Sequence, residues 1–482
     1  MRLQRNILLA FEACFVAAAV AQSSASCSTT LTARYPAPSI ADGYQARLVA
    51  TNLDTPRGIK VDSNGNLLVV TRDVGIVALS LTDEEGGCVT STNVQTVVEN
   101  NRLNHGIELS QDGTTLYAST PNEVYAWTYD PNTRRTSGEP TTLITGMDNA
   151  GHTTRTLLLS RHVPDLLLVS RGSNANLDDL ALDVTSGHCQ LKAFNISNVT
   201  SEPYDFTADG RLLGWGLRNS VGVGEEPVTG GIYTVENSVD QLRREGRDIH
   251  QDNPGEELNF HGYLNGTSSA QQGGNYGYPS CFAAWAVDEI PQNDQLTVGS
   301  QFAIGDQNTN TNDAVCAERI APRLTFPAHM APLDILFNED GTAAWVSFHG
   351  SWNRDDPIGY KLSVIPFANG EPVEPSNSSQ PTVDIMQNPD VGECPDNCFR
   401  PVGLAWDTQG RLFMTSDDTG EIYVITRTDG GNTSSATPTT GLPPAGTSSG
   451  GAAASTTASA ASGATGSLSA LLLAVAVVCL SL

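Results

Sequence analysis

Histidine and arginine side chains recur along this chain in similar local surroundings. His105 follows Arg57 after 48 residues, and His152 follows His105 after 47. Imidazole titrates near neutral pH and can act as a general base, and guanidinium binds carboxylates through paired hydrogen bonds. A pocket that collected these side chains would suit proton removal beside an anionic ligand. The series consists of Arg57, His105, His152, Arg218, His349 and Arg400.

The segments around these residues predict short antiparallel strands. A polar start leads into an apolar run, then into a turn such as Asn64-Gly65, then into a second apolar run. The copy from His152 to Leu159 lacks the glycine turn. The copies begin at Pro56, His105, His152, Tyr204, Pro332 and Arg400.

The length of this repeat predicts the fold. A period of 47 to 48 residues suits a four-stranded blade, so we expect an all-β, six-bladed β-propeller over residues 22–427. The longer gap between 218 and 332 leaves room for an insertion that carries the sequence NYGYP, residues 275–279. A tandem of β-sandwiches is the structural alternative, but it would not explain a repeat of this length.

In a propeller, the residues that start each blade approach the central axis at one face. The His and Arg series is therefore predicted to meet in one pocket. The alternative is that these polar residues cap the axial channel and bond to the backbone. Convergence of several His and Arg side chains from different blades favours the pocket.

Six sequence blocks in a fixed order resemble a known family. They are GHTTRTL (151–157), GLRN (216–219), GEELN (255–259), NYGYP (275–279), FHGSWNR (348–354) with GYK (359–361), and FRPVGL (399–404). The chain resembles the fungal pyranose dehydrogenases that depend on pyrroloquinoline quinone (PQQ). It resembles the bacterial soluble glucose and L-sorbosone dehydrogenases more distantly. The resemblance runs from about residue 45 to 427.

The resemblance implies oxidation of a sugar at its anomeric carbon. A base takes the hydroxyl proton and PQQ takes the hydride. His152 matches the family's base, and Arg218, with Asn219 beside it, would stabilise negative charge on the reduced quinone. Electrons would then pass to an external carrier such as a cytochrome or a quinone.

The resemblance also assigns cofactor and metal ligands. PQQ carries three carboxylates, which need cationic partners. Ca²⁺ would act as a Lewis acid and takes carboxylate and carbonyl oxygens. The expected PQQ-binding residues are Arg57, His105, Asn219, His349, Trp352, Arg354, Lys361 and Arg400, and the expected Ca²⁺ ligands are Glu236, Asn237 and Glu257.

The two ends of the chain predict export. Residues 1–21 have the charge and hydropathy of a signal peptide, residues 428–467 are rich in Gly, Ser, Thr and Ala, and residues 468–482 are apolar. The last two segments match a glycosylphosphatidylinositol (GPI) signal better than a tail-anchored helix, for which the tail is short. We therefore expect an extracellular protein at the cell surface, attached to the membrane only by this anchor.

Composition and glycosylation motifs agree with export. The net charge of −27 argues against nucleic-acid binding. Asn-x-Ser/Thr motifs are expected to be glycosylated at the surface. They stand at Asn195, Asn198, Asn265, Asn377 and Asn432.

The cysteines predict disulfide bonds in an oxidising compartment. Cys14 and Cys479 lie in segments expected to be removed, which leaves seven of the nine. The candidate pairs are Cys394 with Cys398, Cys281 with Cys316, and Cys27 with Cys88, so that Cys189 would be free.

Two other functions are compatible with a propeller. A Ca²⁺-dependent lactone hydrolase would need carboxylates and Asn around a metal, and would have no reason for several Arg. A glycan-binding propeller tethered to the cell wall would not need His152, Arg218 and His349 to converge. The dehydrogenase accounts for more of these residues than either alternative.

Overall fold

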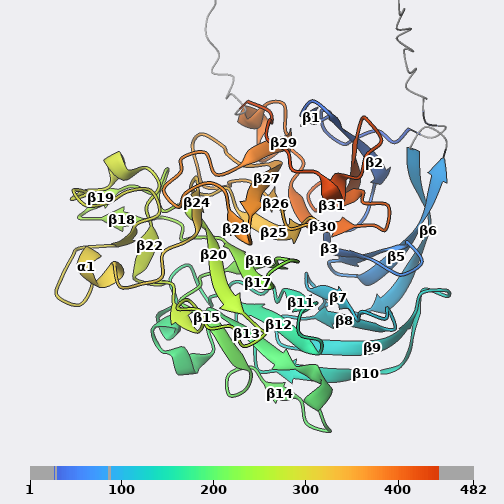
Figure 1. The fold of residues 1–482 in the computed structure, drawn as a ribbon, viewed down its shortest axis with the longest axis horizontal. Helices are drawn as coiled ribbons and strands as arrows, with labels where there is room; N and C mark the ends of the chain where they lie inside the picture. The colour runs from blue at the N-terminus through green and yellow to red at the C-terminus, as the bar shows by residue number, and fades with distance from the viewer. Residues whose placement is uncertain (1–26, 28–29, 85–87, 444–482) are drawn as a thin grey trace, which may run out of the picture. The chain divides into compact units, whose positions relative to one another are not determined.

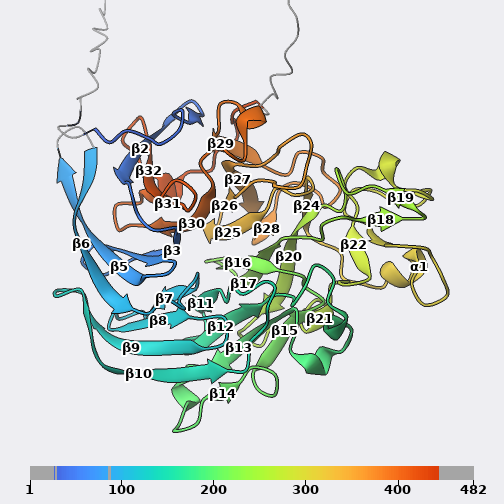
Figure 2. The ribbon, with the colours of Figure 1, turned by 180° about the vertical axis from the view of Figure 1, so that it is seen from behind.

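A computed structural model of the chain describes residues 27, 30–84 and 88–443. Strands make up nearly all regular structure in this part of the chain, and the α-helix α1 (Asp313–Cys316) is very short. Six sheets of at least four strands surround a common axis (Figures 1 and 2). The predicted six-bladed β-propeller is therefore confirmed.

The four main strands of each blade run from the axis outwards. Blades 1 to 3 consist of β3 (Pro56–Val61), β4 (Leu67–Thr71), β5 (Gly75–Glu84) and β6 (Cys88–Glu99); β7 (Ile107–Leu109), β8 (Thr115–Ser119), β9 (Val124–Asp130) and β10 (Arg135–Thr145); and β11 (Leu157–Leu159), β12 (Leu166–Arg171), β13 (Gln190–Asn195) and β15 (Arg211–Trp215). Blades 4 to 6 consist of β16 (Ser220–Glu225), β17 (Gly231–Glu236), β20 (Glu256–Tyr263) and β24 (Leu324–Phe326); β25 (Pro332–Phe337), β26 (Ala343–Phe348), β27 (Lys361–Ala368) and β29 (Val383–Gln387); and β30 (Pro401–Trp406), β31 (Leu412–Ser416), β32 (Glu421–Arg427) and β2 (Tyr44–Ala50).

The core lies between the blades. In β4, Val69 packs with Phe413 of blade 6, and Leu68 packs with Leu116 of blade 2. Successive side chains of a strand point to opposite faces of its sheet, so one strand can supply both interfaces. This explains why β4 is buried along its whole length and is apolar up to Thr71, instead of alternating with polar residues.

The ring is closed by the N-terminal strand. β2 pairs antiparallel with β32, with Tyr44 opposite Arg427 and Leu48 opposite Tyr423. Hydroxyl groups of second strands also join neighbouring blades: Thr415 Oγ1 donates to the Arg57 carbonyl at 2.7 Å, and Ser119 Oγ donates to the Arg155 carbonyl at 2.7 Å. These contacts hold the starts of the innermost strands, where the predicted site residues lie.

One predicted copy of the repeat is not the start of a blade. Tyr204 and Asp205 form β14 (Tyr204–Asp205), which pairs parallel with β10 at the outer edge of blade 2. Blade 4 starts instead at Ser220 in β16. The prediction was wrong because a glycine turn such as Asp209-Gly210 does not indicate which strand of a blade follows it.

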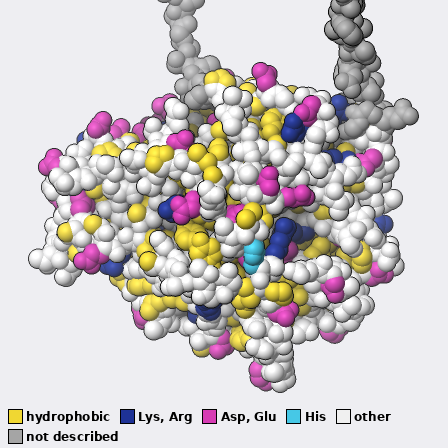
Figure 3. Space-filling model, in the orientation of Figure 1, with side chains coloured by type: hydrophobic (Ala, Val, Ile, Leu, Met, Phe, Trp, Pro, Cys, Tyr) yellow, Lys and Arg dark blue, Asp and Glu magenta, His cyan; other side chains and the backbone are white. Residues whose placement is uncertain are grey.

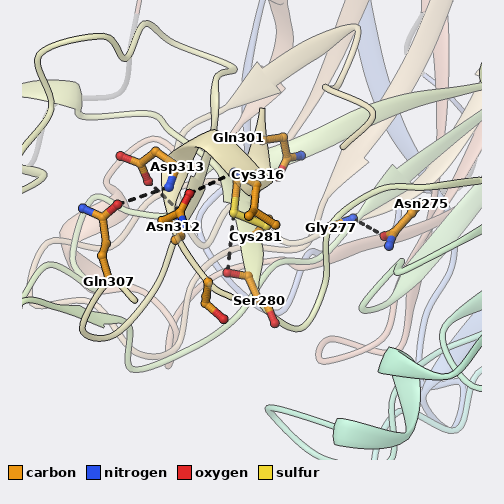
Figure 4. Close-up of a disulfide and its surroundings, with 12 residues drawn as sticks. Asn275, Gly277, Ser280, Cys281, Gln301, Gln307, Asn312, Asp313 and Cys316 are labelled. Carbon is orange, nitrogen blue, oxygen red and sulfur yellow. Dashed lines mark hydrogen bonds between the residues drawn. A yellow bond between two sulfur atoms is a disulfide. The ribbon is translucent and has the colours of Figure 1, made fainter. Parts of the chain in front are cut away.

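The predicted insertion is present in blade 4, between β20 and β24. It contains β21 (Gly274–Asn275), β22 (Cys281–Ala283), β23 (Gln301–Ala303) and α1. Asn312 caps α1 by accepting a hydrogen bond from the Val315 amide at 3.0 Å. The Cys281–Cys316 disulfide ties α1 to β22, as Figure 4 shows.

The predicted disulfides are all confirmed. Cys27 pairs with Cys88, Cys281 with Cys316, and Cys394 with Cys398. Cys189 is a buried free thiol. Of the five glycosylation motifs, Asn198, Asn265, Asn377 and Asn432 are exposed, and Asn195 is partly buried.

The propeller extends beyond residue 427. Thr433 and Ser434 are buried, and their amides bond to the Gly410 carbonyl at 2.9 and 3.0 Å. The Leu442 amide donates to the Asp384 carbonyl at 2.8 Å. Residues 428–443, which we expected to belong to a linker, therefore pack on the propeller, because the fold satisfies backbone groups that composition alone leaves unpaired.

The predicted signal peptide, the rest of the linker and the C-terminal tail lie outside the described residues. No helix within the described residues is long and apolar enough to cross a membrane.

Candidate functional site

His152 lies just before β11, the innermost strand of blade 3, and contacts the loop that follows β12. Its amide donates to the Ser173 carbonyl at 2.8 Å, and its Nδ1 lies 2.8 Å from Ser173 Oγ. Burial, with the nearby Arg218 guanidinium, lowers the pKa of His152 to about 3. The imidazole is therefore neutral at ordinary pH and able to accept a proton.

A glycine brings His152 close to Asn219. A Cβ on Gly172 would lie 2.6 Å from Asn219 Oδ1 and 2.8 Å from His152 Cβ. Any larger residue would push the two side chains apart. The backbone of residue 172 therefore passes between the predicted base and the predicted amide donor.

Arg218 is 4% exposed and uses all five of its N–H groups within the protein. Nε donates to the Asn176 carbonyl at 3.1 Å, and Nη2 donates to Asn176 Oδ1 at 2.8 Å and to Asp240 Oδ2 at 3.0 Å. Nη1 donates to the carbonyls of Asn237 and Ser238. The positive charge of Arg218 stays beside His152, and the hydrogen bonds of the guanidinium connect the loop at Asn176 with the loop at residues 237–240.

A second group of side chains is joined by Asp417, which the sequence analysis missed. Arg57 Nη1 donates to Asp417 Oδ2 at 2.7 Å, and His349 Nε2 lies 2.8 Å from Asp417 Oδ1. These two neighbours hold the pKa of Asp417 well below its usual range despite burial. Asp417 follows directly after β31, as His349 follows directly after β26. The second strand of a blade runs antiparallel to the first, so it ends at the face where the first strand starts. This register was the signal in the sequence that could have placed Asp417 at the site.

Arg400 and His105 complete the second group. Arg400 donates to the carbonyls of His349 and Gly350 at 3.2 and 2.9 Å. His105 is 4% exposed, and burial with the nearby Arg57 lowers its pKa to about 3. Its Nδ1 has no hydrogen-bond partner within the described residues, which leaves a buried polar atom able to bind a ligand.

The two groups lie at the same face of the propeller. Asn104, next to His105, donates to the carbonyl and hydroxyl oxygens of Thr153, next to His152, at 3.1 and 3.2 Å. The space-filling view shows a His side chain beside Lys or Arg side chains near the centre of this view (Figure 3). The structure therefore places the predicted series at one face of the propeller, in two groups: Arg57, His105, His349 and Arg400, and His152 and Arg218 with Asn219 beside them.

Three predicted cofactor ligands make other contacts. Trp352 is 67% exposed, and Arg354 pairs with Asp252 at 2.9 Å. Lys361 pairs with Asp384 at 2.9 Å. Lys361 starts the third strand of blade 5, which lies two strand spacings, or about 10 Å, outside the innermost strand. Sequence order alone does not show this distance from the axis.

The predicted calcium ligands make hydrogen bonds within the protein. Glu236 Oε1 accepts from the Arg218 amide at 2.6 Å, and the Asn237 side chain donates to the Pro332 carbonyl at 2.6 Å. Asn259 Nδ2 bridges the carboxylates of Glu236 and Glu257, at 3.2 and 2.9 Å. Burial raises the pKa of both carboxylic acids, and for Glu257 it reaches about 7. Within residues 27, 30–84 and 88–443, no three His, Cys, Asp or Glu side chains are grouped to hold a metal ion.

The six innermost strands surround an axial cavity of about 300 Å³. It begins at His105 and contains the ion pair between Lys60 and Glu108, 3.0 Å apart. Asp334 lines its wall and accepts from the amides of Ile335 and Leu404 at 2.9 and 2.8 Å. Of the predicted His and Arg series, only His105 lines this cavity.

Asp334 makes stability depend on pH. Burial raises its pKa from 3.8 to about 6. A raised carboxyl pKa contributes stability that is complete below about pH 3.8 and is lost as pH rises through about 6. We therefore expect the Asp334 carboxyl to lower the free energy of unfolding as pH rises across that window. Asp334→Asn should make the free energy of unfolding less dependent on pH there. Urea denaturation at several pH values tests this, with the exposed Asp294→Asn as control; equal slopes in wild type and Asp334→Asn would contradict it.

Comparison with known proteins identifies the family. The family model described as TrAA12-like matches residues 38–428. The chain belongs to the TrAA12-like family. It is 51% identical over 418 residues to a PQQ-dependent sugar dehydrogenase of Hypocrea jecorina, covering 84% of this chain and 94% of that protein. It is 37% identical over 409 residues to a PQQ-dependent pyranose dehydrogenase of Coprinopsis cinerea, covering 81% of this chain and 55% of that protein.

Solved structures agree with the TrAA12-like assignment. A calcium structure of a Trichoderma reesei member of family AA12 has 50% identity and a TM-score of 0.81, and covers 83% of this chain and all of that chain. The PQQ-bound aldose sugar dehydrogenase of Streptomyces coelicolor has 16% identity and a TM-score of 0.50, with 80% of this chain and 99% of that chain covered. This second likeness supports the propeller fold alone.

Proposed function

We propose that this TrAA12-like protein is a PQQ-dependent sugar dehydrogenase. It oxidises a pyranose or ketoaldose at the anomeric carbon and passes the electrons to an external carrier. The observation that carries the proposal is the neutral His152 at the same face as Arg57, His105, His349 and Arg400. The names of the two relatives support the same activity.

The second group of side chains fits an anionic cofactor. Arg57 is paired through Nη1 alone in the described structure, so its other donors can bind a carboxylate, and Arg400 adds a second guanidinium. His105 Nδ1 is a buried atom without a partner there. These residues would hold PQQ, whose carbonyl accepts a hydride from the sugar.

His152 is proposed to take the proton of the sugar hydroxyl. Its lowered pKa keeps it neutral before the reaction, and a nearby substrate oxygen would donate to its free nitrogen. Arg218 places a fixed positive charge near this nitrogen without needing to move, because two loops hold it. Asn219 is held beside His152 across Gly172.

Trp352 is proposed to contact the sugar ring rather than the cofactor. It is 67% exposed, yet the next residue, Asn353, bonds to Asp240 at 2.6 Å. An exposed aromatic ring on a held loop is a suitable platform for the apolar face of a pyranose. We expect Trp352→Ala to raise KM by about 5- to 10-fold with little change in kcat, as for loss of uniform binding. Steady-state kinetics test this, with exposed Val373→Ala as control; an unchanged KM would contradict it.

Calcium and cell-surface attachment are also part of the proposal. The calcium structure of the Trichoderma reesei relative supports testing Ca²⁺, with Glu236, Asn237 and Glu257 as the proposed ligands. Three disulfides and four exposed glycosylation motifs support an extracellular protein. The composition of the C-terminal segments supports the GPI anchor, and we propose a cytochrome or quinone as the electron acceptor.

The proposal is tested by titrating the metal-stripped protein with PQQ, with and without Ca²⁺. Cofactor absorbance reports binding, and dye reduction with a panel of aldoses and ketoaldoses reports turnover. Saturable binding with sugar-dependent bleaching is the expected result. Absence of PQQ binding at micromolar concentration would contradict the proposal and leave the lactone hydrolase and the glycan-binding propeller, which lactone hydrolysis and glycan-binding assays separate.

A further inference from the structure

The hydrogen bonds of Ser173 determine the tautomer of His152. The Ser173 hydroxyl is completely buried and lies 2.7 Å from the Ala175 carbonyl, which can only accept. The single hydroxyl proton is therefore donated to Ala175. Toward His152 Nδ1, 2.8 Å away, Ser173 Oγ can act only as acceptor, so Nδ1 carries the proton.

We propose that Ser173 is the positioning residue of the base and holds His152 as the Nδ1–H tautomer. The other ring nitrogen, Nε2, then carries the lone pair. It forms no hydrogen bond within the described residues and is the nitrogen able to take a substrate proton. The inference rests on the proposed function, because it assigns this nitrogen as the acceptor in the dehydrogenase reaction.

The carbonyl that fixes the Ser173 hydroxyl is itself held in place. Tyr278 Oη lies 3.0 Å from the Asn176 carbonyl and 3.4 Å from the Ala175 carbonyl. The Asn174 amide donates to Asp178 Oδ2 at 2.7 Å, and the Ser173 amide donates to the Arg218 carbonyl at 2.8 Å. Each residue from 173 to 176 thus has at least one backbone group with a partner, so the hydroxyl has little freedom to turn its proton toward His152.

A neutral partner suits a base that must start uncharged. A carboxylate at this position would favour the imidazolium form, whereas a hydroxyl oxygen orients the ring without adding negative charge. The charged groups that act on His152 are Arg218 and Arg155, and both disfavour protonation. The site therefore combines a defined tautomer with a neutral ring.

The tautomer can be read directly in the cofactor-free protein by ¹⁵N NMR of labelled histidine. The chain has eight histidines, and the His152→Gln variant assigns the signals of interest. We expect a protonated, pyrrole-type Nδ1 and an unprotonated, pyridine-type Nε2 at neutral pH. In Ser173→Ala, the signals should move toward a mixture of tautomers. A protonated Nε2 in the wild type, or identical spectra in Ser173→Ala, would overturn the inference.

Kinetics provide the second readout. We expect Ser173→Ala to lower kcat roughly 10- to 100-fold, as is typical for residues that orient another group, with KM and PQQ affinity little changed. Ser173→Thr, which keeps the hydroxyl, should recover part of the rate. Ser91→Ala is the matched control, since that hydroxyl also donates to a carbonyl, that of Val49 at 2.6 Å, but joins the outer strands β6 and β2, outside both groups of the site. An unchanged kcat in Ser173→Ala would overturn the assigned role.

The two readouts separate this inference from the proposed function. If the wild type neither binds PQQ nor oxidises sugars, the proposed function fails, whatever the NMR spectrum shows. If the wild type is an active dehydrogenase but Nε2 carries the proton, the inference about Ser173 alone fails.

Discussion

Replacing His152 with Ala lowers kcat by roughly two to four orders of magnitude, the usual cost of losing a general base. PQQ binding should persist, because the cation-rich group of Arg57, His105, His349 and Arg400 does not depend on this imidazole. Single-turnover reduction of bound PQQ by sugar, followed by absorbance, measures the step directly.

The control for this prediction is His162→Ala. His162 is exposed and bonds to the Pro227 carbonyl at 2.8 Å, outside both groups of the site, so its loss should leave turnover unchanged. Turnover near that of the wild type in His152→Ala would remove His152 from the mechanism and leave the reaction without an assigned base.

Replacing Arg218 with Ala is expected to lower stability, rate and PQQ affinity together. The guanidinium is buried and connects the loop at Asn176 with the loop at Asn237, Ser238 and Asp240. Breaking a buried ion pair and its hydrogen bonds typically costs about 3–5 kcal/mol of unfolding free energy. The loop that loosens also carries Ser173, so His152 should lose its orientation as well.

Urea denaturation and a PQQ titration measure the two parts of this effect. Arg218→Lys keeps the charge but has three donors for five acceptors, so it should recover the stability only in part. Arg243→Ala is the control, because Arg243 is mostly exposed and its pairing with Asp248 at 3.5 Å is at the surface. Unchanged stability and PQQ affinity in Arg218→Ala would contradict the role assigned to Arg218.

Several features of the site follow from local sequence. Glycine turns such as Asn64-Gly65 and the 47 to 48 residue spacing predict blades, because turn chemistry and strand alternation act over a few residues. The starts of first strands then reach one face whatever the details of packing. This is why Arg57, His105 and His152 could be assigned to one site before the structure was known.

Other features were beyond local reasoning. The copy at Tyr204 was misassigned because strand order within a blade depends on pairing with β10, far from it in sequence. The loop that carries Trp352 is held by Asp240, 113 residues away along the chain, a contact that local sequence does not show. The calcium ligands stay a prediction, because sequence does not show the neighbours of a buried carboxylate, here Arg218 and Asn259, which bond to the oxygens of Glu236.

Local sequence was enough to predict the six-bladed architecture and the face at which Arg57, His105 and His152 lie, since these depend on short-range periodicity and on residue chemistry, and it supplied candidate disulfide pairs that the structure confirms. The tertiary structure alone decided which partners those residues have. Asp417 joins Arg57 from 360 positions away, and Ser173 selects the free nitrogen of His152 from 21 positions away. The Arg57–Asp417 pair exists only when the ring of blades closes, because closure brings the end of the second strand of blade 6 to the start of the first strand of blade 1, whereas His152 and Ser173 meet within blade 3 when β11 pairs with β12.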